Sequence, residues 1–480
     1  MNDCNTRTRT RSGPRRIAPI PVAGKPLQFS RLASSLPVLF FVFLLAAALT
    51  GCGVSGNSSY QPPDVVPPTV FPAASTQTWL QQFGTNTLLP PARGATTAAD
   101  NPTGVAVDLH GNIVVAGYTY GAFPGYSNAA AVPEGFLAKF RNDGKRVWLR
   151  QFQQQQAIGC NQIAIDRHGN ILTVALQSTG SAGGTSTGAN ATVVDKFSRR
   201  GHLRWTHPVP LTSTFSGAAI AVDSQGNIAV MVAQQATSQG LVSSIVLKLD
   251  GATGQVLWQQ TLNGGTYNSF GAIAIDSLGN VIVIGVAKVS TSGYISGEQT
   301  QIVKLASDDG QRLWIQQPYS QMDFGRKVFY SVAVDAQDNI LVGGTTYTYP
   351  VQCLLGKFSG ETGKPIWQQQ FSAIGGSFLT TVNVDPEGNV IATGTTQGNF
   401  ASSFTLPAQN NFVVKFNPDG QNIWAQQFGT GPVTLLGSTG PFVTTDAQGN
   451  IIVTGMTTGA YQGFSNPKHA AEVYLVKFGP

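Results

Sequence analysis

The sequence predicts an all-β fold in which one unit of four short antiparallel strands is repeated. Three observations predict it: evenly spaced tryptophans, a recurring Asp…Gly-Asn turn between β-branched segments, and no apolar pattern with a helical period of 3.6 residues. The seven tryptophans stand 53 to 69 residues apart, at Trp79, Trp148, Trp205, Trp258, Trp314, Trp367 and Trp424. Such regular placement of the largest side chains indicates copies of one structural unit.

Each unit begins with an apolar strand that ends in aspartate. The seven aspartates are Asp108, Asp166, Asp223, Asp276, Asp335, Asp385 and Asp446. We expect each to accept hydrogen bonds from the amides of a tight turn ending in Gly-Asn, where glycine supplies a positive φ without steric cost. The fifth copy has Asp338 in place of the glycine, and aspartate tolerates the left-handed region. A β-branched second strand follows, as in residues 113–117.

The third strand of each unit ends in a lysine and the fourth carries the tryptophan. The lysines are Lys139, Lys196, Lys248, Lys304, Lys357, Lys415 and Lys477. Each of the first six precedes a tryptophan by nine or ten residues, which places the two on adjacent strands of one hairpin. We expect the lysine stem to pack against the indole, with its ammonium group bound to carbonyl groups or to a turn carboxylate.

Four-stranded meanders repeated around an axis form a β-propeller. Seven aspartate turns, seven lysine strands and seven tryptophan strands predict seven four-stranded antiparallel blades over residues 76–480. The tryptophan strand comes first in this region and the lysine strand comes last. We therefore expect the Trp79 strand to join the last blade and close the ring, which removes a free sheet edge.

The residues before the repeats are typical of an export signal. The leader before Cys52 holds seven bases and one acid, so the formal net charge of +6 belongs to it and the remainder is neutral. The apolar run 38–49 is shorter than the roughly 20 residues of a membrane span but suits a secretion signal. Leu49-Thr50-Gly51-Cys52 resembles the lipobox of bacterial lipoproteins. Residues 1–51 are therefore predicted to be a lipoprotein signal peptide and Cys52 to carry lipid; the alternative is a plain secretory signal with an incidental cysteine.

Residues 52–75 are rich in Ser, Gly and Pro and predict a tether between the lipidated cysteine and the folded body. Such a chain would be exported and membrane-anchored, in the periplasm or at the cell surface, and the sequence leaves inner and outer membrane open. A neutral mature chain lacks the surplus of bases that nucleic-acid binding needs. Cys160 and Cys353 fall in separate units, so we expect two small buried thiols without a disulfide.

The signature of residues 104–117 resembles the SBBP repeats, the propeller repeats of exported bacterial proteins, and the resemblance extends over residues 79–480. It implies a seven-bladed β-propeller. Two weaker resemblances exist. NHL-type repeats share the Asp…Gly-Asn hairpin, and residues 249–258 and 361–367 resemble the docking motif of quinoprotein (PQQ-like) propellers, which usually have eight blades.

The second-to-third and blade-to-blade connections are long and variable, and they share one face of a meander propeller. Function concentrates in loops on a rigid scaffold, so this face is the predicted binding face. The connections concerned are residues 84–103, 118–134, 177–191, 319–330, 395–411 and 456–472. Two related loops, 121–128 and 459–466, carry Phe123, Tyr126, Tyr461 and Phe464. These aromatics would form a platform for a glycan or peptide, or would cap the cores of their blades.

The sequence offers no catalytic motif: it lacks a nucleophile elbow, metal-binding histidine spacing, a Walker loop and paired carboxylates. We therefore assign no catalytic residue, metal or cofactor, and one carboxylate per hairpin is too few for calcium. The predicted function is a non-catalytic binding or scaffolding lipoprotein with a monomeric propeller, whose partners are an envelope protein, peptide or glycan and, through lipid, the membrane. Enzymatic activity stays open. The alternatives are a quinoprotein-like or polysaccharide-processing enzyme and an outer-membrane assembly factor.

Overall fold

The computed structural model describes residues 76–85, 99–128, 133–152, 157–178, 190–209, 215–235, 242–262, 267–291, 294–319, 327–348, 350–373, 375–400, 410–430, 440–466 and 470–480. Residues 1–75, which include the predicted signal peptide, Cys52 and the tether, lie outside this set. Every regular element in the described residues is a β-strand. They contain no helix with the length and apolar character needed to span a membrane. The described residues all belong to one compact unit.

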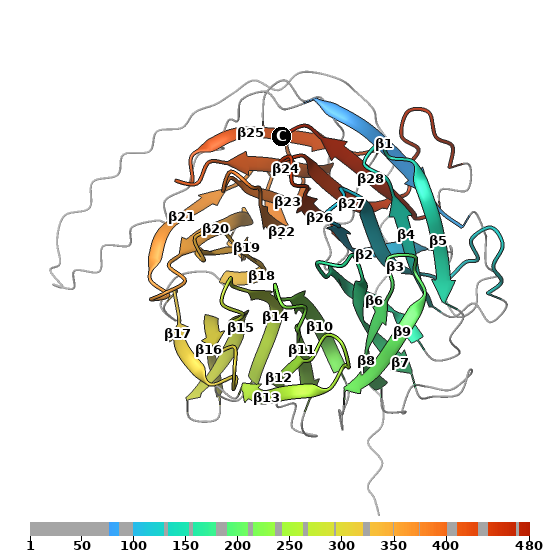
Figure 1. The fold of residues 1–480 in the computed structure, drawn as a ribbon. Coiled ribbons are helices and arrows are strands. Elements are labelled where there is room, and N and C mark those ends of the chain that lie inside the picture. The colour runs from blue at the N-terminus through green and yellow to red at the C-terminus, as the bar shows by residue number, and fades with distance from the viewer. Residues whose placement is uncertain are drawn as a thin grey trace, which may run out of the picture. The chain divides into compact units, whose positions relative to one another are not determined.

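The strands form seven four-stranded antiparallel sheets arranged as blades of a ring (Figure 1). Blade one consists of β2 (Asp100–Val107), β3 (Ile113–Thr119), β4 (Glu134–Phe140) and β5 (Arg146–Phe152). Blade two consists of β6 (Ala157–Ile165), β7 (Ile171–Ser178), β8 (Asn190–Phe197) and β9 (Leu203–Val209). Blade three consists of β10 (Phe215–Val222), β11 (Ile228–Gln235), β12 (Val242–Leu249) and β13 (Val256–Leu262). Blade four consists of β14 (Tyr267–Ile275), β15 (Val281–Thr291), β16 (Tyr294–Leu305) and β17 (Arg312–Gln316).

The remaining blades keep the same order, except that the last one draws on both ends of the ring. Blade five consists of β18 (Lys327–Val334), β19 (Ile340–Thr346), β20 (Gln352–Phe358) and β21 (Pro365–Phe371). Blade six consists of β22 (Ser377–Val384), β23 (Val390–Thr396), β24 (Asn410–Phe416) and β25 (Asn422–Phe428). Blade seven consists of β26 (Phe442–Thr445), β27 (Ile451–Thr457), β28 (Glu472–Phe478) and β1 (Gln77–Phe83). The predicted all-β, seven-bladed fold is confirmed.

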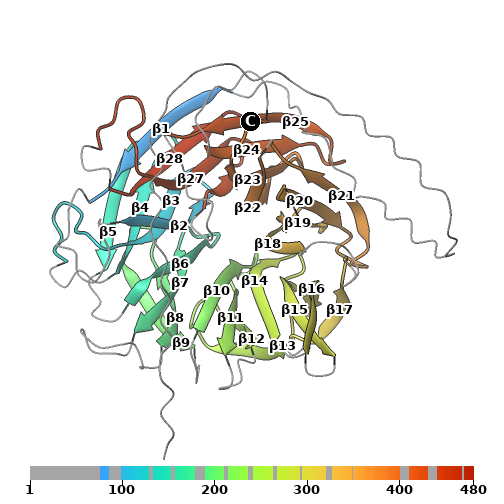
Figure 2. The same cartoon turned by 180° about the vertical axis from the view of Figure 1, so that it is seen from behind.

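Blade seven takes its outer strand from the beginning of the ring. Strand β1 pairs antiparallel with β28, with Trp79 opposite Lys477 and Phe83 opposite Val473. No turn joins the third and fourth strands of blade seven. Instead, the residue after β28 meets the residue before β1: the N–H of Gly479 donates to the carbonyl of Thr76 at 3.2 Å. Both views of the ring place β1 on the rim beside β28 (Figure 2).

The apolar core is divided among the interfaces between blades. The described residues form seven buried clusters, one between each pair of neighbouring blades, including the pair formed by blades seven and one. Middle strands such as β3, β19 and β27 are buried along most or all of their length because another blade covers each of their faces. This burial explains their continuous β-branched and apolar sequences, whereas outer strands such as β21 alternate between exposed and half-buried residues.

Candidate functional site

The turn between the first and second strands of each blade is organised by its aspartate. In blade one, Asp108 Oδ1 accepts the N–H groups of His110 and Asn112, both at 2.9 Å, and Oδ2 accepts the Asn112 amide. Gly111 ends the turn with a φ of 75°. The same backbone and asparagine contacts recur at Asp166, Asp223, Asp276, Asp335, Asp385 and Asp446. The carboxylates are thus fully engaged in local structure.

The fifth copy of this turn differs for a reason that the structure supplies. Asp338 adopts a φ of 61°, in the left-handed region that glycine fills in the other copies. Its carboxylate accepts the N–H of Ser277 at 2.8 Å and the hydroxyl of Ser277 at 2.6 Å. Ser277 belongs to the corresponding turn of blade four, so Asp338 joins two blades, which a glycine could not do.

A buried ion pair lies beneath every one of these turns. The ammonium group of the third-strand lysine lies 2.8 to 3.3 Å from the turn carboxylate, and both side chains are buried in all seven copies. Burial alone would raise the pKa of Asp108, but hydrogen bonds from Asn112 and Lys139 outweigh it and hold the pKa below its usual range. The pKa of Asp166, Asp276, Asp335 and Asp446 is lowered in the same way. The predicted binding of each ammonium group to a turn carboxylate is confirmed.

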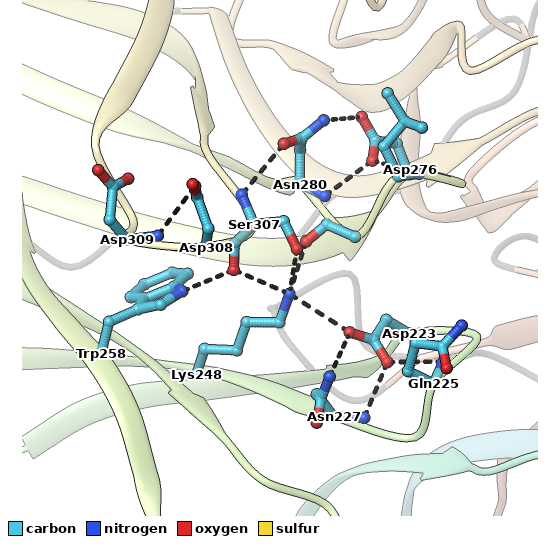
Figure 3. Close-up of polar contacts among 12 residues, drawn as sticks. Asp223, Gln225, Asn227, Lys248, Trp258, Asp276, Asn280, Ser307, Asp308 and Asp309 are labelled. Atoms are coloured by element: carbon cyan, nitrogen blue, oxygen red, sulfur yellow. Dashed lines mark hydrogen bonds and ion pairs between the residues drawn. The ribbon is translucent and has the colours of Figure 1, made fainter.

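Lysine and tryptophan together tie each blade to the next one. Lys248 faces Trp258 across β12 and β13, and both bind the Ser307 carbonyl in the third-to-fourth turn of blade four (Figure 3). The N···O distances are 3.2 Å from Lys248 and 2.9 Å from Trp258. The Lys248 ammonium group also donates to the Ser307 hydroxyl and to the Gly279 carbonyl, at 2.7 and 2.8 Å. These acceptors, together with the Asp223 carboxylate, satisfy a buried cation that would otherwise be costly.

Three other tryptophans make the equivalent contact. The indoles of Trp79, Trp314 and Trp367 donate to a turn carbonyl of the following blade at 2.9, 3.3 and 2.9 Å. Among the described residues, the Trp205 Nε1 is buried without a partner. Trp424 faces blade seven, where no third-to-fourth turn exists, and it packs in the apolar cluster between blades six and seven.

The indole rings also explain a glycine in each of these turns. A Cβ atom at Gly310 would lie 2.6 Å from the Trp258 ring, and one at Gly144 would lie 2.9 Å from the Trp79 ring. Gly310 and Gly144 also have φ values of 70° and 81°. A larger residue would therefore lose both the turn conformation and the contact between blades.

Three of the four loop aromatics pack at interfaces between blades, and they do so at two different interfaces. Phe123 is 2% exposed and lies with Tyr126 in the cluster between blades seven and one. Its ring centroid lies 5.3 Å from that of Phe136. Tyr461 packs between blades six and seven, 5.7 Å from the Tyr474 ring, and Phe464 is half-buried. A ring as buried as that of Phe123 cannot stack on a ligand, so its position favours the other expectation, that these aromatics cap the cores of their blades.

A buried glutamine in the fourth strand fixes each of these loops. Gln151 Oε1 accepts the Phe123 N–H at 2.9 Å, and its Nε2 donates to the Gly121 carbonyl at 3.0 Å. Gln82 bonds the Tyr461 N–H and the Gly459 carbonyl in the same way, at 2.9 and 3.0 Å. The glutamine amide therefore supplies the backbone hydrogen bonds that a neighbouring strand would supply if the loop were part of the sheet.

Blade six holds a third copy of this clamp, which the sequence analysis missed. Gln427 accepts the Phe400 N–H and donates to the Gly398 carbonyl, both at 2.9 Å. Phe400 is 2% exposed and packs against Phe371 and Phe412. The signal that could have found it is a shared pattern, Thr-x-Gly-x-aromatic, beginning at Thr119, Thr396 and Thr457.

Comparison with known proteins adds one family match. The family model described as an SBBP β-propeller repeat matches residues 78–124, from the first tryptophan strand to the loop after β3. These residues contain the aspartate turn that recurs in all seven blades. The chain is an SBBP-type β-propeller. No functionally curated protein matches it in sequence.

Several solved structures resemble the SBBP-type propeller at low identity. The structure of U3-55K is 8% identical over 84% of this chain and 99% of that one, with a TM-score of 0.49. The Pan2 WD40 domain of Neurospora crassa is 13% identical over 86% and 100%, with a TM-score of 0.47. The β-propeller domain of the Trilobed protease from Pyrococcus furiosus is 10% identical over 78% and 95%, with a TM-score of 0.45. The family assignment rests on the repeat and not on these structures.

The seam of the SBBP-type propeller contains buried acids that the repeat did not predict. Asp100 is 1% exposed and accepts the Thr85 N–H at 2.7 Å and the Thr119 hydroxyl. Burial, with a smaller contribution from the nearby Glu472, raises its pKa to about 6 against the effect of these bonds. Glu472 accepts the Gln82 amide at 2.7 Å. A Cβ atom at Gly84 would lie 2.8 Å from Asp100 and 2.5 Å from Glu472, so the chain passes between the two acids only as glycine.

Within the described part of the chain, no group of three or more His, Cys, Asp and Glu side chains is placed to hold a metal ion. Cys353 is a free thiol with no exposed surface, and burial raises its pKa well above the usual value. The side chain of Cys160 lies outside the described set, so its predicted burial stays a prediction.

Proposed function

We propose that the protein is a non-catalytic binding or scaffolding module, exported and held at a membrane by lipid on Cys52. In this proposal it engages a protein, peptide or glycan through the face that carries the second-to-third and blade-to-blade connections. A seven-bladed propeller is consistent with a binding or scaffolding module. Fold alone does not determine a ligand, but the two faces of the ring differ in their connections.

That difference is the observation that carries the proposal. The connections on one face, between first and second and between third and fourth strands, each contain five or six residues. We call it the short-turn face. On the opposite face, the second-to-third connections vary from two residues after β15 to fourteen after β3 and β27. A face whose connections differ from blade to blade is suited to recognition, because the repeated scaffold places no demand on their sequence.

The internal contacts also favour the variable face. On the short-turn face, the aspartates, lysines and most tryptophans are bound to turn groups of their own or the next blade. On the variable face, the glutamine clamps fix three loops in blades six, seven and one, which form one continuous arc of the ring. Loops held in this way are preorganised, and preorganisation lowers the entropy lost on binding.

Binding is tested with the propeller from Pro62 to Pro480 on glycan and peptide arrays. Tyr126→Ala combined with Phe464→Ala, which remove half-buried rings of the variable face, should lower array signals at least ten-fold. The matched control is Leu109→Ala, because Leu109 is 77% exposed on the short-turn face. Equal signals from all three proteins, or a loss with Leu109→Ala, would contradict the proposed face.

Anchoring is tested on the full chain expressed in a bacterial host. The intact mass of the protein from membranes should correspond to a chain that begins at Cys52 and carries acyl groups. Cys52→Ser should release the protein into the soluble fraction. Retention of Cys52→Ser in the membrane with an uncleaved leader would contradict lipid anchoring.

A further inference from the structure

The short-turn face is electrically divided, although the chain after the leader is neutral as a whole. The turns of blades one and two and the strand starts beside them expose seven bases: Arg141, Lys145, Arg146, Arg167, Arg199, Arg200 and Arg204. One exposed acid accompanies them, Asp143, which pairs with Arg141 at 3.1 Å. We call these seven bases the arginine patch.

The opposite half of the same face has the opposite sign. The corresponding turns of blades four to six expose five acids, Asp308, Asp309, Glu361, Glu387 and Asp419, against two bases, Arg312 and Lys364. The ring therefore carries a lateral charge separation that a sum over the sequence conceals. Since the aspartate and lysine of each buried pair neutralise each other, the exposed charges of the turns dominate the field at this face.

The bases of the arginine patch belong to one continuous surface. The third-to-fourth turn of blade two lies against β5, because Lys139 donates to the Arg199 carbonyl at 3.4 Å and Gly201 meets the Trp148 ring. Within the described residues, Arg167, Arg199 and Arg200 form no ion pair with a carboxylate. Their guanidinium groups are thus available for an anionic partner, and guanidinium binds phosphate through paired hydrogen bonds.

The chain enters the ring beside this patch. Strand β1 begins at the short-turn face, because Gln77 pairs with Phe478 at the end of β28. The adjacent Trp79 indole donates to the Asn142 carbonyl, in the turn that also carries Arg141 and Lys145. Any segment that precedes Thr76, including the proposed lipid anchor, therefore joins the propeller next to the patch.

A tether alone would not orient the propeller. The 24 residues between Cys52 and Gln77 reach about 80 to 90 Å when fully extended, whereas a seven-residue strand spans only about 23 Å. Either face could then lie against the membrane. A cluster of bases close to the point of attachment favours one orientation, because anionic lipid headgroups attract each exposed arginine.

We propose that the arginine patch binds the anionic headgroups of the membrane to which the chain is tethered. This contact turns the short-turn face toward the lipid and presents the variable face to partners. The inference rests on the proposed membrane anchoring, but it concerns a different set of residues and a different interaction.

The test uses the propeller from Pro62 to Pro480, which lacks the leader and Cys52, so that lipidation cannot contribute. Binding is measured by sedimentation with vesicles of 30% phosphatidylglycerol in phosphatidylcholine and with pure phosphatidylcholine vesicles. We expect binding to the anionic vesicles that weakens with salt. Arg167→Gln, Arg199→Gln and Arg200→Gln combined should lower the affinity by roughly 100-fold, about five-fold for each charge. The three Arg→Lys changes should retain most of it.

A matched control separates the patch from net charge. Asp308→Asn, Asp309→Asn and Glu361→Gln combined raise the net charge by three on the opposite half of the face. Unchanged binding by this variant supports the patch, whereas a gain equal to the loss in the arginine variant would assign the effect to net charge alone and overturn the proposal.

Three further outcomes would also overturn it. The first is equal binding to both vesicle types. The second is retention on an acidic polysaccharide such as polygalacturonate without vesicle binding, which would assign the patch to a glycan. The third is a dimer in sedimentation that both triple variants abolish, which would pair the basic half with the acidic half of a second copy. If the propeller does not bind anionic vesicles but Cys52 is acylated in the full chain, the proposed anchoring stands without the patch. If the propeller binds these vesicles but Cys52 is not acylated, the patch stands without the lipid anchor.

Discussion

Trp79 and Lys477 face each other across β1 and β28, as tryptophan and lysine do within one hairpin of each other blade. The two residues stand near opposite ends of the described chain. Both side chains also contact blade one: the Trp79 indole donates to the Asn142 carbonyl, and the Lys477 ammonium group donates to the Asn142 side chain. The seam therefore repeats the interactions of the other interfaces, but no turn connects its third and fourth strands.

Trp79→Ala should weaken the seam more selectively than the same change elsewhere. The indole is half-buried, so we expect the free energy of unfolding to fall by about 2 kcal/mol. This is less than the roughly 3–5 kcal/mol lost when a fully buried aromatic residue is replaced by alanine. The control is Trp148→Ala, at the equivalent position of blade one. Urea midpoints should fall for both, but only Trp79→Ala should make β1 susceptible to limited proteolysis, because no turn ties β1 to β28. Identical cleavage patterns would contradict the importance of the seam.

Lys248→Met should be strongly destabilising. The change leaves the Asp223 carboxylate buried without its cation, which costs about 3–5 kcal/mol in comparable cases. Adding Asp223→Asn should recover part of the loss, since an uncharged amide needs no buried partner of opposite charge. Lys145→Met, at an exposed lysine, should change stability by less than about 0.5 kcal/mol. Thermal or urea unfolding measures all three, and no recovery in the double variant would show that the lysine acts only through its carbonyl contacts.

Asp100 should make stability depend on pH between about 4 and 7. Its folded pKa of about 6 lies above the usual 3.8, so the folded state binds the proton more tightly than the unfolded state does. The stability that it contributes is fully present below about pH 4 and is lost as pH rises from there through the folded pKa, by up to about 3 kcal/mol in total. Asp100→Asn should flatten the profile of unfolding free energy in this window, and Asp143→Asn, at an exposed acid, should not. A steep profile that survives Asp100→Asn would assign the effect to another group.

Gln151→Ala should release the loop that contains Phe123. The change removes the acceptor for the Phe123 N–H and the donor to Gly121, and it leaves the Glu134 carboxylate without the amide at 2.7 Å. Hydrogen exchange of residues 120–126 should accelerate by at least ten-fold. Gln370→Ala is the matched control, because Gln370 occupies the equivalent position of blade five but is exposed. Unchanged exchange in Gln151→Ala would show that the Phe123 ring alone fixes the loop.

The repeat was sufficient to predict the ring because each blade carries its own copy of the same contacts. Counting aspartate turns and tryptophan strands gave seven blades, and the lysine spacing gave the ion pair under each turn. The candidate site was harder to predict. Whether Phe123 is a ligand-binding ring or a core ring depends on its burial between two blades, and Asp100 has no counterpart in the repeat. Contacts across the seam join residues far apart in sequence, which no local pattern records.

The junction of Gly479 and Thr76 has a consequence for engineering. Since the two ends lie within hydrogen-bonding distance, a short Gly-rich linker can join them into a continuous hairpin like those of the other six blades. The polypeptide can then be reopened in another third-to-fourth turn, for example between Asp143 and Gly144, without breaking a strand. Such a circular permutant would keep the architecture while moving the point of attachment to a different sector of the ring, so that the direction in which the molecule is presented becomes a design variable.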